Sequence, residues 1–262
     1  MSRPKGSPRR VVLLCGPGPS THIVHHALTR ELGPIDTVME TVPTRWFLLR
    51  RRIKKLGLAT VAGQVPFQAA VVPLLRRASA RRIEQIKREH GLDDSPIQDP
   101  VTHVPSVNTD EAREVLRRLD PAVVVVNGTR IIGRKTLDCV AAPFVNMHAG
   151  ITPAYRGVHG GYWALAEGRP ELAGTTIHFV DEGIDTGGII AQGRFEVTPE
   201  DSFATYPYLH LAAGVPLLVR TVRGILDGNL QRDPVPEGLA SRLRTHPTLW
   251  GYAAARLLRG VR

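Results

Sequence analysis

Residues 143–150 read Pro143-Phe144-Val145-Asn146-Met147-His148-Ala149-Gly150. The apolar run predicts a β-strand that is buried on both faces and ends at Ala149-Gly150. Asn146 and His148 are two positions apart, so both side chains leave the same face at the carboxyl end of this strand. Ligands bind at that end of an open α/β sheet. Because an unpaired buried polar group costs free energy, the histidine is either bonded to the backbone or part of a functional pair.

Other apolar runs lie on both sides of this strand and alternate with stretches of helical pattern. The further predicted strands are 11–15, 35–39, 121–126, 175–180 and 188–197, and the main predicted helices are 22–32, 110–119 and 202–227. Strands that alternate with helices predict the α/β class, here a Rossmann-like, mainly parallel sheet with helices on both faces. The length of 262 residues suffices for one sizeable core.

The net charge of +10 is confined to one segment. Twelve Lys and Arg against two Glu between Arg45 and His90 account for all of it. The remainder of the chain is neutral, which excludes a uniformly basic nucleic-acid binder. We expect a basic helical insertion over about 44–95.

Inside this segment, Leu56 to Leu75 carries no formal charge and is flanked by basic clusters. Its length would permit a membrane span of roughly 20 residues, although Gly63, Pro66 and Pro73 interrupt it. Three interpretations stay open: helices packed on the α/β core with solvated basic ends, a segment lying on an anionic membrane surface, or a span.

The cysteines and the N-terminus bear on the cellular compartment. Cys15 and Cys139 show no metal or disulfide spacing and are interpreted as buried thiols in a reducing cytoplasm. Val11 to Cys15 is too short for the apolar region of a secretory signal. The expected location is therefore cytoplasmic, with peripheral attachment at the inner membrane surface as the option that the basic segment raises.

The motif region resembles the folate-dependent formyltransferase family. Phe144 to Gly157 is similar to the family's Asn-x-His strand end, which is followed by a Pro and an Arg-Gly turn. Glu182-Gly183-Ile184-Asp185-Thr186-Gly187-Gly188 resembles the family's Asp-containing loop, and Gly174 to Val180 resembles the strand before it. Several motifs in the right order are more specific than a single glycine pattern. The resemblance implies a formyltransferase domain over 9–228 and a short C-terminal tail over 229–262.

The resemblance implies roles for Asn146, His148 and Asp185. Formyl transfer is attack of an amine on a formamide carbon, and the oxyanion that forms needs hydrogen-bond donors. Asn146 offers an amide N–H and His148 a ring N–H. Asp185 can move a proton from the attacking amine to the leaving nitrogen through a water, and its charge would favour protonated His148.

The same resemblance assigns the ligand-binding residues. The co-substrate 10-formyltetrahydrofolate would be held by Arg130, Ile131, Ile132, Val180, Asp181, Glu182, Gly183 and Ile184. No metal is expected. For the acceptor, Gly16 and Gly18 bind a phosphate or form a plain tight turn. The loop that contains His103 resembles a loop near the acceptor in amino-sugar formyltransferases. His159 either faces the acceptor or begins a helix.

The acceptor expected from these motifs is a small-molecule amine, an amino sugar on a nucleotide or lipid carrier. Alternatives are formylation of glycinamide ribonucleotide or methionyl-tRNA, and hydrolysis of 10-formyltetrahydrofolate by a deformylase. A tRNA partner is not expected, because the residues after Leu226 are too few for the C-terminal tRNA-contacting domain of methionyl-tRNA formyltransferases. The non-enzyme alternative is a membrane-surface protein with a degenerate formyltransferase fold.

Overall fold

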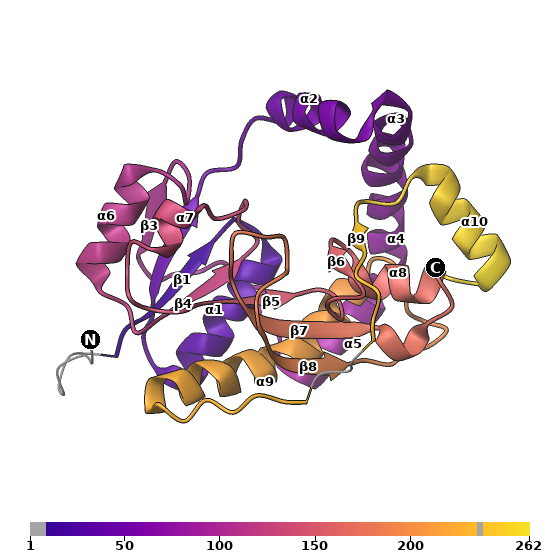
Figure 1. Cartoon of the computed structure of the whole chain (residues 1–262). Helices are drawn as coiled ribbons and strands as arrows, with labels where there is room; N and C mark the ends of the chain where they lie inside the picture. Colours follow the sequence, from indigo (N-terminus) through magenta and orange to yellow (C-terminus); the bar gives the residue numbers. More distant parts are fainter. Residues whose placement is uncertain (1–8, 235–237) are drawn as a thin grey trace.

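The computed structural model describes residues 9–234 and 238–262. Its centre is a seven-stranded sheet with the order β3-β2-β1-β4-β5-β7-β8 (Figure 1). The strands are β1 (Val11–Cys15), β2 (Asp36–Glu40), β3 (Val101–Val104), β4 (Val123–Asn127), β5 (Phe144–His148), β7 (Gly174–Phe179) and β8 (Ile189–Arg194). Strands β1 to β5 pair in parallel, whereas β7 pairs antiparallel with both of its neighbours, β5 and β8. The predicted mainly parallel, Rossmann-like sheet is thus confirmed.

Helices cover both faces of this sheet, as the uninterrupted apolar strands require. In β1, Val11, Leu13 and Cys15 pack into one core and Val12 and Leu14 into the other. The first core is shared with α1 (Pro19–Leu32), α5 (Ala80–His90) and α9 (Tyr206–Asp227), and the second with α6 (Asp110–Leu119) and α7 (Arg134–Leu137).

The basic insertion forms a projecting arm, defined here as residues 45–78. It consists of α2 (Arg45–Leu56), α3 (Leu58–Pro66), the π-helical turn η1 (Phe67–Val71) and α4 (Val72–Ala78). Gly57, with φ 83°, supplies the left-handed backbone between α2 and α3. Figure 1 shows α2 standing clear of the sheet and α3 to α4 leading back toward it. Phe67 anchors the arm, because its fully buried ring packs on Phe203 and Tyr252.

The C-terminal segment folds back onto the motif region. β9 (Leu243–Arg244) pairs in parallel with β6 (Arg156–Gly157), and α10 (Leu249–Arg259) contacts α3 and α8 (Gly160–Ala166). The remaining element is the 3-10 turn η2 (Pro170–Leu172). The predicted division into a domain over 9–228 and a tail over 229–262 stays a prediction.

We predict that Phe67→Ala destabilises the protein by about 3–5 kcal/mol, because the change leaves a cavity beside the rings of Phe203 and Tyr252. Leu74→Ala is the matched control on the same arm, since Leu74 is 67% exposed and should change the free energy of unfolding by less than about 0.5 kcal/mol. Urea unfolding measures both values. Equal effects would contradict docking of the arm through Phe67.

Candidate active site

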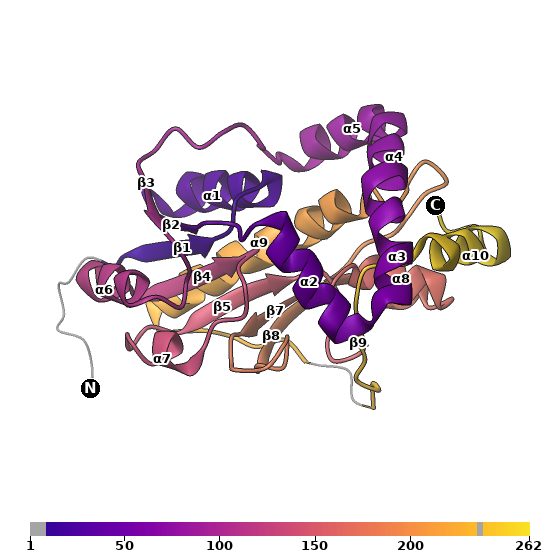
Figure 2. The same ribbon diagram turned by 90° about the horizontal axis from the view of Figure 1, so that it is seen from above.

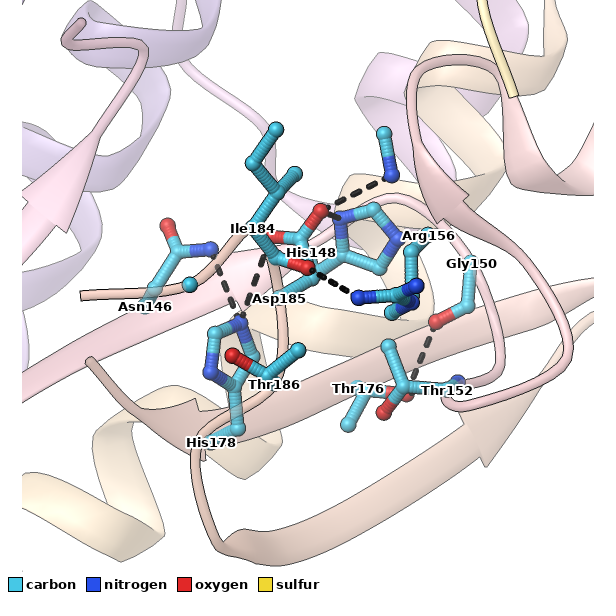
Figure 3. Close-up of polar contacts among 12 residues, drawn as sticks. Asn146, His148, Gly150, Thr152, Arg156, Thr176, His178, Ile184, Asp185 and Thr186 are labelled. Atoms are coloured by element: carbon cyan, nitrogen blue, oxygen red, sulfur yellow. Dashed lines mark hydrogen bonds and ion pairs between the residues drawn. The ribbon is translucent and has the colours of Figure 1, made fainter. Parts of the chain in front are cut away.

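The pairing of β5 with β7 builds one wall of the candidate site. The two strands run antiparallel with Asn146 opposite His178 and His148 opposite Thr176. Residues directly opposite on neighbouring strands share a face, so Asn146, His148 and His178 lie together at the end of β5. Figure 3 shows these side chains turned toward Asp185, which arrives from the loop after β7.

Asp185 is the centre of this cluster. Its Oδ2 lies 3.3 Å from Nδ1 of His148 and accepts the backbone N–H of Gly157 at 2.9 Å. Its Oδ1 lies 3.6 Å from Nε2 of His178. The Asp185 side chain is 13% exposed, against 5% for His148 and 4% for His178. The Asp185 carboxylate is therefore more accessible to small molecules than either imidazole.

A backbone carbonyl can only accept, so it fixes the proton on the histidine nitrogen that it contacts, and two histidines of the cluster have such a contact. Nε2 of His148 lies 2.7 Å from the Tyr155 carbonyl and therefore carries a proton. Nδ1 of His178 donates in the same way to the Phe179 carbonyl at 2.7 Å, so its Nε2 accepts from Nδ2 of Asn146 at 3.1 Å. Nδ1 of His148 is thus the site at which a proton enters or leaves beside Asp185.

The charge states of His148 and Asp185 depend on their burial and on the contact between them. Burial lowers the pKa of His148 below its ordinary value, against the opposing effects of the Asp185 charge and the Tyr155 carbonyl. The predicted stabilisation of protonated His148 by Asp185 is therefore present but outweighed. Burial acts to raise the pKa of Asp185, yet contacts with His178, His148 and the Gly157 N–H prevail and hold that pKa below its ordinary value.

The loop that carries Asp185 is cross-linked internally. Oδ1 of Asp181 accepts the Gly183 N–H at 3.0 Å and the Thr186 hydroxyl at 2.7 Å. Nη1 of Arg156 donates to the Ile184 carbonyl at 3.2 Å. Asp185 itself has φ 52°, a left-handed conformation that an aspartate tolerates better than most residues. These contacts hold the carboxylate in place.

The two segments predicted to bind the folate lie next to each other. Ile132 is buried in the core cluster against which Val180 packs. Nη1 of Arg134 lies 4.0 Å from Oε2 of Glu182. Ile131 is 49% exposed at this place. Arg130 is held by Glu40, at 2.6 Å between Nε and Oε2, so its guanidinium stabilises the turn after β4.

A cavity of about 300 Å³ adjoins the cluster on the side of Met147, Ala149 and Gly157. Its lining is mainly apolar and aromatic, with polar atoms from a few residues, as in many ligand pockets. We name it the acceptor pocket after the role that is proposed for it below. It is lined by Ser20, Asn127, Gly128, Met147, Ala149, Gly157, Val158, His159, Gly161, Tyr162, Phe195, Phe203, Tyr206, Pro207, His210 and Leu211.

The structure places the residues predicted to bind the acceptor in different parts of the protein. His159 lines the acceptor pocket and bonds to His246 at 2.8 Å. His103 instead lies exposed on the edge strand β3, paired with Met39. Gly16 packs so closely on the Gly128 carbonyl that a side chain would collide with it. This contact explains the glycine at position 16, and the alternatives of a tight turn and a phosphate site both stay predictions.

Three histidines of this region were not predicted as site residues. His178 orients Asn146, His246 pairs with His159, and His210 lines the acceptor pocket. Burial lowers the pKa of both His159 and His210 to about 3 and that of His246 to about 4. Within the described residues, buried Nδ1 of His210 has no hydrogen-bond partner. Only the strand pattern around His178 gave any signal in the sequence.

Among residues 9–234 and 238–262, no group of three or more His, Cys, Asp and Glu side chains is placed to hold a metal ion. The cluster around Asp185 is instead arranged for hydrogen bonding and proton exchange.

The comparisons with known proteins agree with this geometry. A methionyl-tRNA formyltransferase from Chlorobium chlorochromatii (strain CaD3) is 35% identical over 144 residues, which cover 55% of this chain and 45% of that protein. The chain spans about half the length of the curated relatives it matches.

Two solved structures share the fold. A sugar N-formyltransferase from Shewanella sp FDAARGOS_354 has a TM-score of 0.56 at 15% identity, covering 90% of this chain and 76% of that one. The N-formyltransferase from Helicobacter canadensis, in complex with folinic acid and dTDP-3-aminofucose, has a TM-score of 0.52 at 15% identity, covering 89% and 70%. The family model described as formyl transferase matches residues 75–222, which include Asn146, His148 and Asp185. Since this match spans more than half of the sequence, the chain belongs to the formyl transferase family.

Proposed function

We propose that this protein transfers a formyl group from 10-formyltetrahydrofolate directly to a primary amine, and that the amine belongs to an amino sugar. The observation that carries the proposal is the meeting of Asn146, His148 and Asp185 at one sheet edge. Asn146 offers an amide donor bonded to His178, and the imidazoles of His148 and His178 lie 3.3 and 3.6 Å from the ionised carboxylate of Asp185. Acyl transfer to an amine needs these three kinds of group.

Each residue has a role in this proposal. Asn146 uses one amide N–H on His178 and keeps the second for the oxyanion of the formyl group. As the new carbon–nitrogen bond forms, the amine must lose a proton, and the leaving folate nitrogen must gain one as its bond to carbon breaks. Nδ1 of His148 and the Asp185 carboxylate can pass that proton, directly or through a water, so no net proton is released.

The folate is proposed to lie along Ile131, Ile132 and the backbone of residues 180–184. Exposed Ile131 offers an apolar contact to a flat ring, and the loop offers backbone donors and acceptors for its edge. Arg130 is assigned a supporting role through Glu40 rather than a direct contact. Support for a folate donor also comes from the folinic acid in the Helicobacter canadensis complex. When bound, the donor supplies the formyl group.

The acceptor pocket supports an amino sugar. Its described lining contains no Lys, Arg, Asp or Glu, so it offers no cation for a phosphate. Aromatic faces such as those of Tyr162 and Phe203 suit the apolar face of a sugar ring. The phosphate-bearing carrier would then extend out of the pocket, which makes glycinamide ribonucleotide a less suitable acceptor.

Methionyl-tRNA is the second candidate acceptor, because the curated relatives are methionyl-tRNA formyltransferases. A screen with 10-formyltetrahydrofolate against amino sugars, glycinamide ribonucleotide and methionyl-tRNA tests the proposal by the release of tetrahydrofolate. Release of formate without any amine would instead identify a hydrolase.

His148→Ala and Asp185→Asn should each lower turnover at least about a hundredfold, since each removes a donor or a proton relay. The dissociation constant of the folate should change much less. Glu196→Gln removes an exposed carboxylate outside the cluster and should keep turnover within about twofold. Steady-state rates and folate titration measure both properties. Near-normal turnover in both cluster variants would refute these roles.

The titration of His148 gives a test that does not need the acceptor. Because burial lowers its pKa, the imidazole should titrate below pH 6.5 in NMR spectra of the free protein. The Asp185 charge raises that pKa, so Asp185→Asn should move the midpoint further down. Glu196→Gln should leave the midpoint unchanged. An upward movement in Asp185→Asn would contradict the electrostatic coupling.

Blocking the acceptor pocket should weaken the binding of the amine and leave the binding of the folate unchanged. Ser20 is exposed at the start of α1 and lines the pocket, so Ser20→Trp should fill part of it. We expect the KM for the amine to rise at least about tenfold, equivalent to ~1.4 kcal/mol, while folate affinity is retained. Ser20→Ala should behave like the wild type. A loss of folate affinity with an unchanged amine KM would place the acceptor elsewhere.

A further inference from the structure

We propose that the arm and α10 form a docking surface for an anionic lipid bilayer. The first observation is that α3, η1 and α4 form a 21-residue apolar helix, Leu58–Ala78, that the fold leaves largely uncovered. Only 22% of its most apolar window is buried, compared with 50% for α9, which has a similar composition and lies under the sheet. Leu58 and Leu74 are 69% and 67% exposed.

The inner face of this helix is already occupied. Phe67 packs on Phe203, and Nε2 of Gln64 donates to the His246 carbonyl at 2.6 Å. The helix is therefore attached to the rest of the protein through its inner face, and its outer face stays exposed. An exposed apolar face of this extent calls for a partner, because soluble proteins rarely expose a large contiguous apolar patch.

The second observation is the composition of α2. It exposes Trp46 and Phe47 together with the basic residues Arg50, Arg51, Lys54 and Lys55. Residues 41–83 contain no Asp or Glu. Among the described residues, the cations from 50 to 77 form no salt bridge; Arg50 instead lies over the Trp46 ring at 5.1 Å. Helices that lie in a membrane interface combine aromatic and basic side chains in this manner.

The third observation extends the apolar surface to α10. Trp250 of α10 lies directly against Gly63 of α3, where no side chain would fit. Leu257 and Leu258, further along α10, are each 83% exposed. Both views show α10 beside α3 at the same flank of the molecule (Figures 1 and 2). The apolar surface thus comes from two segments that are far apart in the sequence.

The charge pattern favours a bilayer over other occupants. A second copy of this chain would bring two arms of the same charge together, which costs free energy. An RNA would need cations across the contact, whereas residues 56–75 carry none. A bilayer with anionic headgroups matches both parts: headgroups meet the basic ends at 50–55 and 76–77, and the acyl boundary meets the uncharged centre.

This surface lies next to the acceptor pocket. Phe67 of the arm contacts Phe203, which lines the pocket and lies 4.7 Å from the ring of His159. Docking would therefore bring the pocket close to the membrane. Resting on the proposed function, this placement favours an amino sugar on a lipid carrier; the membrane contact itself does not depend on that function.

The test uses the full chain and vesicles of phosphatidylcholine with or without phosphatidylglycerol, in the absence of folate and amine. We expect sedimentation with the anionic vesicles at low salt and release as salt rises, because salt screens surface charges. The tryptophan emission should shift to shorter wavelength on binding, and Trp46→Phe should reduce that shift, leaving the part that comes from Trp250 of α10. No sedimentation with anionic vesicles at low ionic strength would overturn the proposal.

A charge-matched pair of variants makes the test specific to the arm. Replacing Arg50, Arg51, Lys54 and Lys55 with Gln should lower vesicle binding at least about tenfold and leave the unfolding midpoint and the transfer to a soluble amine unchanged. The control replaces four exposed cations on the opposite side of the sheet, Arg117, Arg118, Arg134 and Lys135, and should bind like the wild type. Equal losses in both variants, or an RNA-binding activity lost with the arm variant and no vesicle binding, would overturn the proposal.

Discussion

The site depends on one constraint: a carboxylate withdrawn from water needs polar partners that compensate for its lost hydration. Asp185 meets this constraint through partners from three places in the chain. His148 comes from β5, His178 from β7 and the Gly157 N–H from β6. These contacts hold the loop after β7 with Asp185 over the end of β5.

The Gly157 N–H in turn depends on the C-terminal segment. β6 exists because β9 pairs with it, and the Val158 N–H donates to the Arg244 carbonyl at 3.2 Å. The same segment supplies His246 to His159 and, through α10, contacts the arm. Residues 238–262 thus contact elements of the Asp185 cluster, the acceptor pocket and the arm.

The sequence predicted the parts of this structure that local patterns encode. Apolar runs identified β1, β4 and β5, and the spacing of Asn146 and His148 placed both on one face. The partner His178 could not be predicted, because its position depends on the antiparallel register between β5 and β7. The pairing of Arg130 with Glu40 was missed for the same reason, since it joins β2 to the turn after β4. The exposure of the arm also required the tertiary structure.

The apolar lining of the acceptor pocket has a chemical consequence beyond shape. An amine attacks only in its neutral form, and most primary amines are protonated near neutral pH. Burial that lowers the pKa of His159 and of His210 to about 3 disfavours an ammonium group in the same surroundings. The ionised Asp185 acts in the opposite direction at the edge of the pocket, where the amine becomes positively charged as it attacks. Under the proposed function, the pocket would thus favour the neutral nucleophile before the bond forms, and Asp185 would favour the charge that appears afterwards, which is the differential stabilisation that catalysis requires.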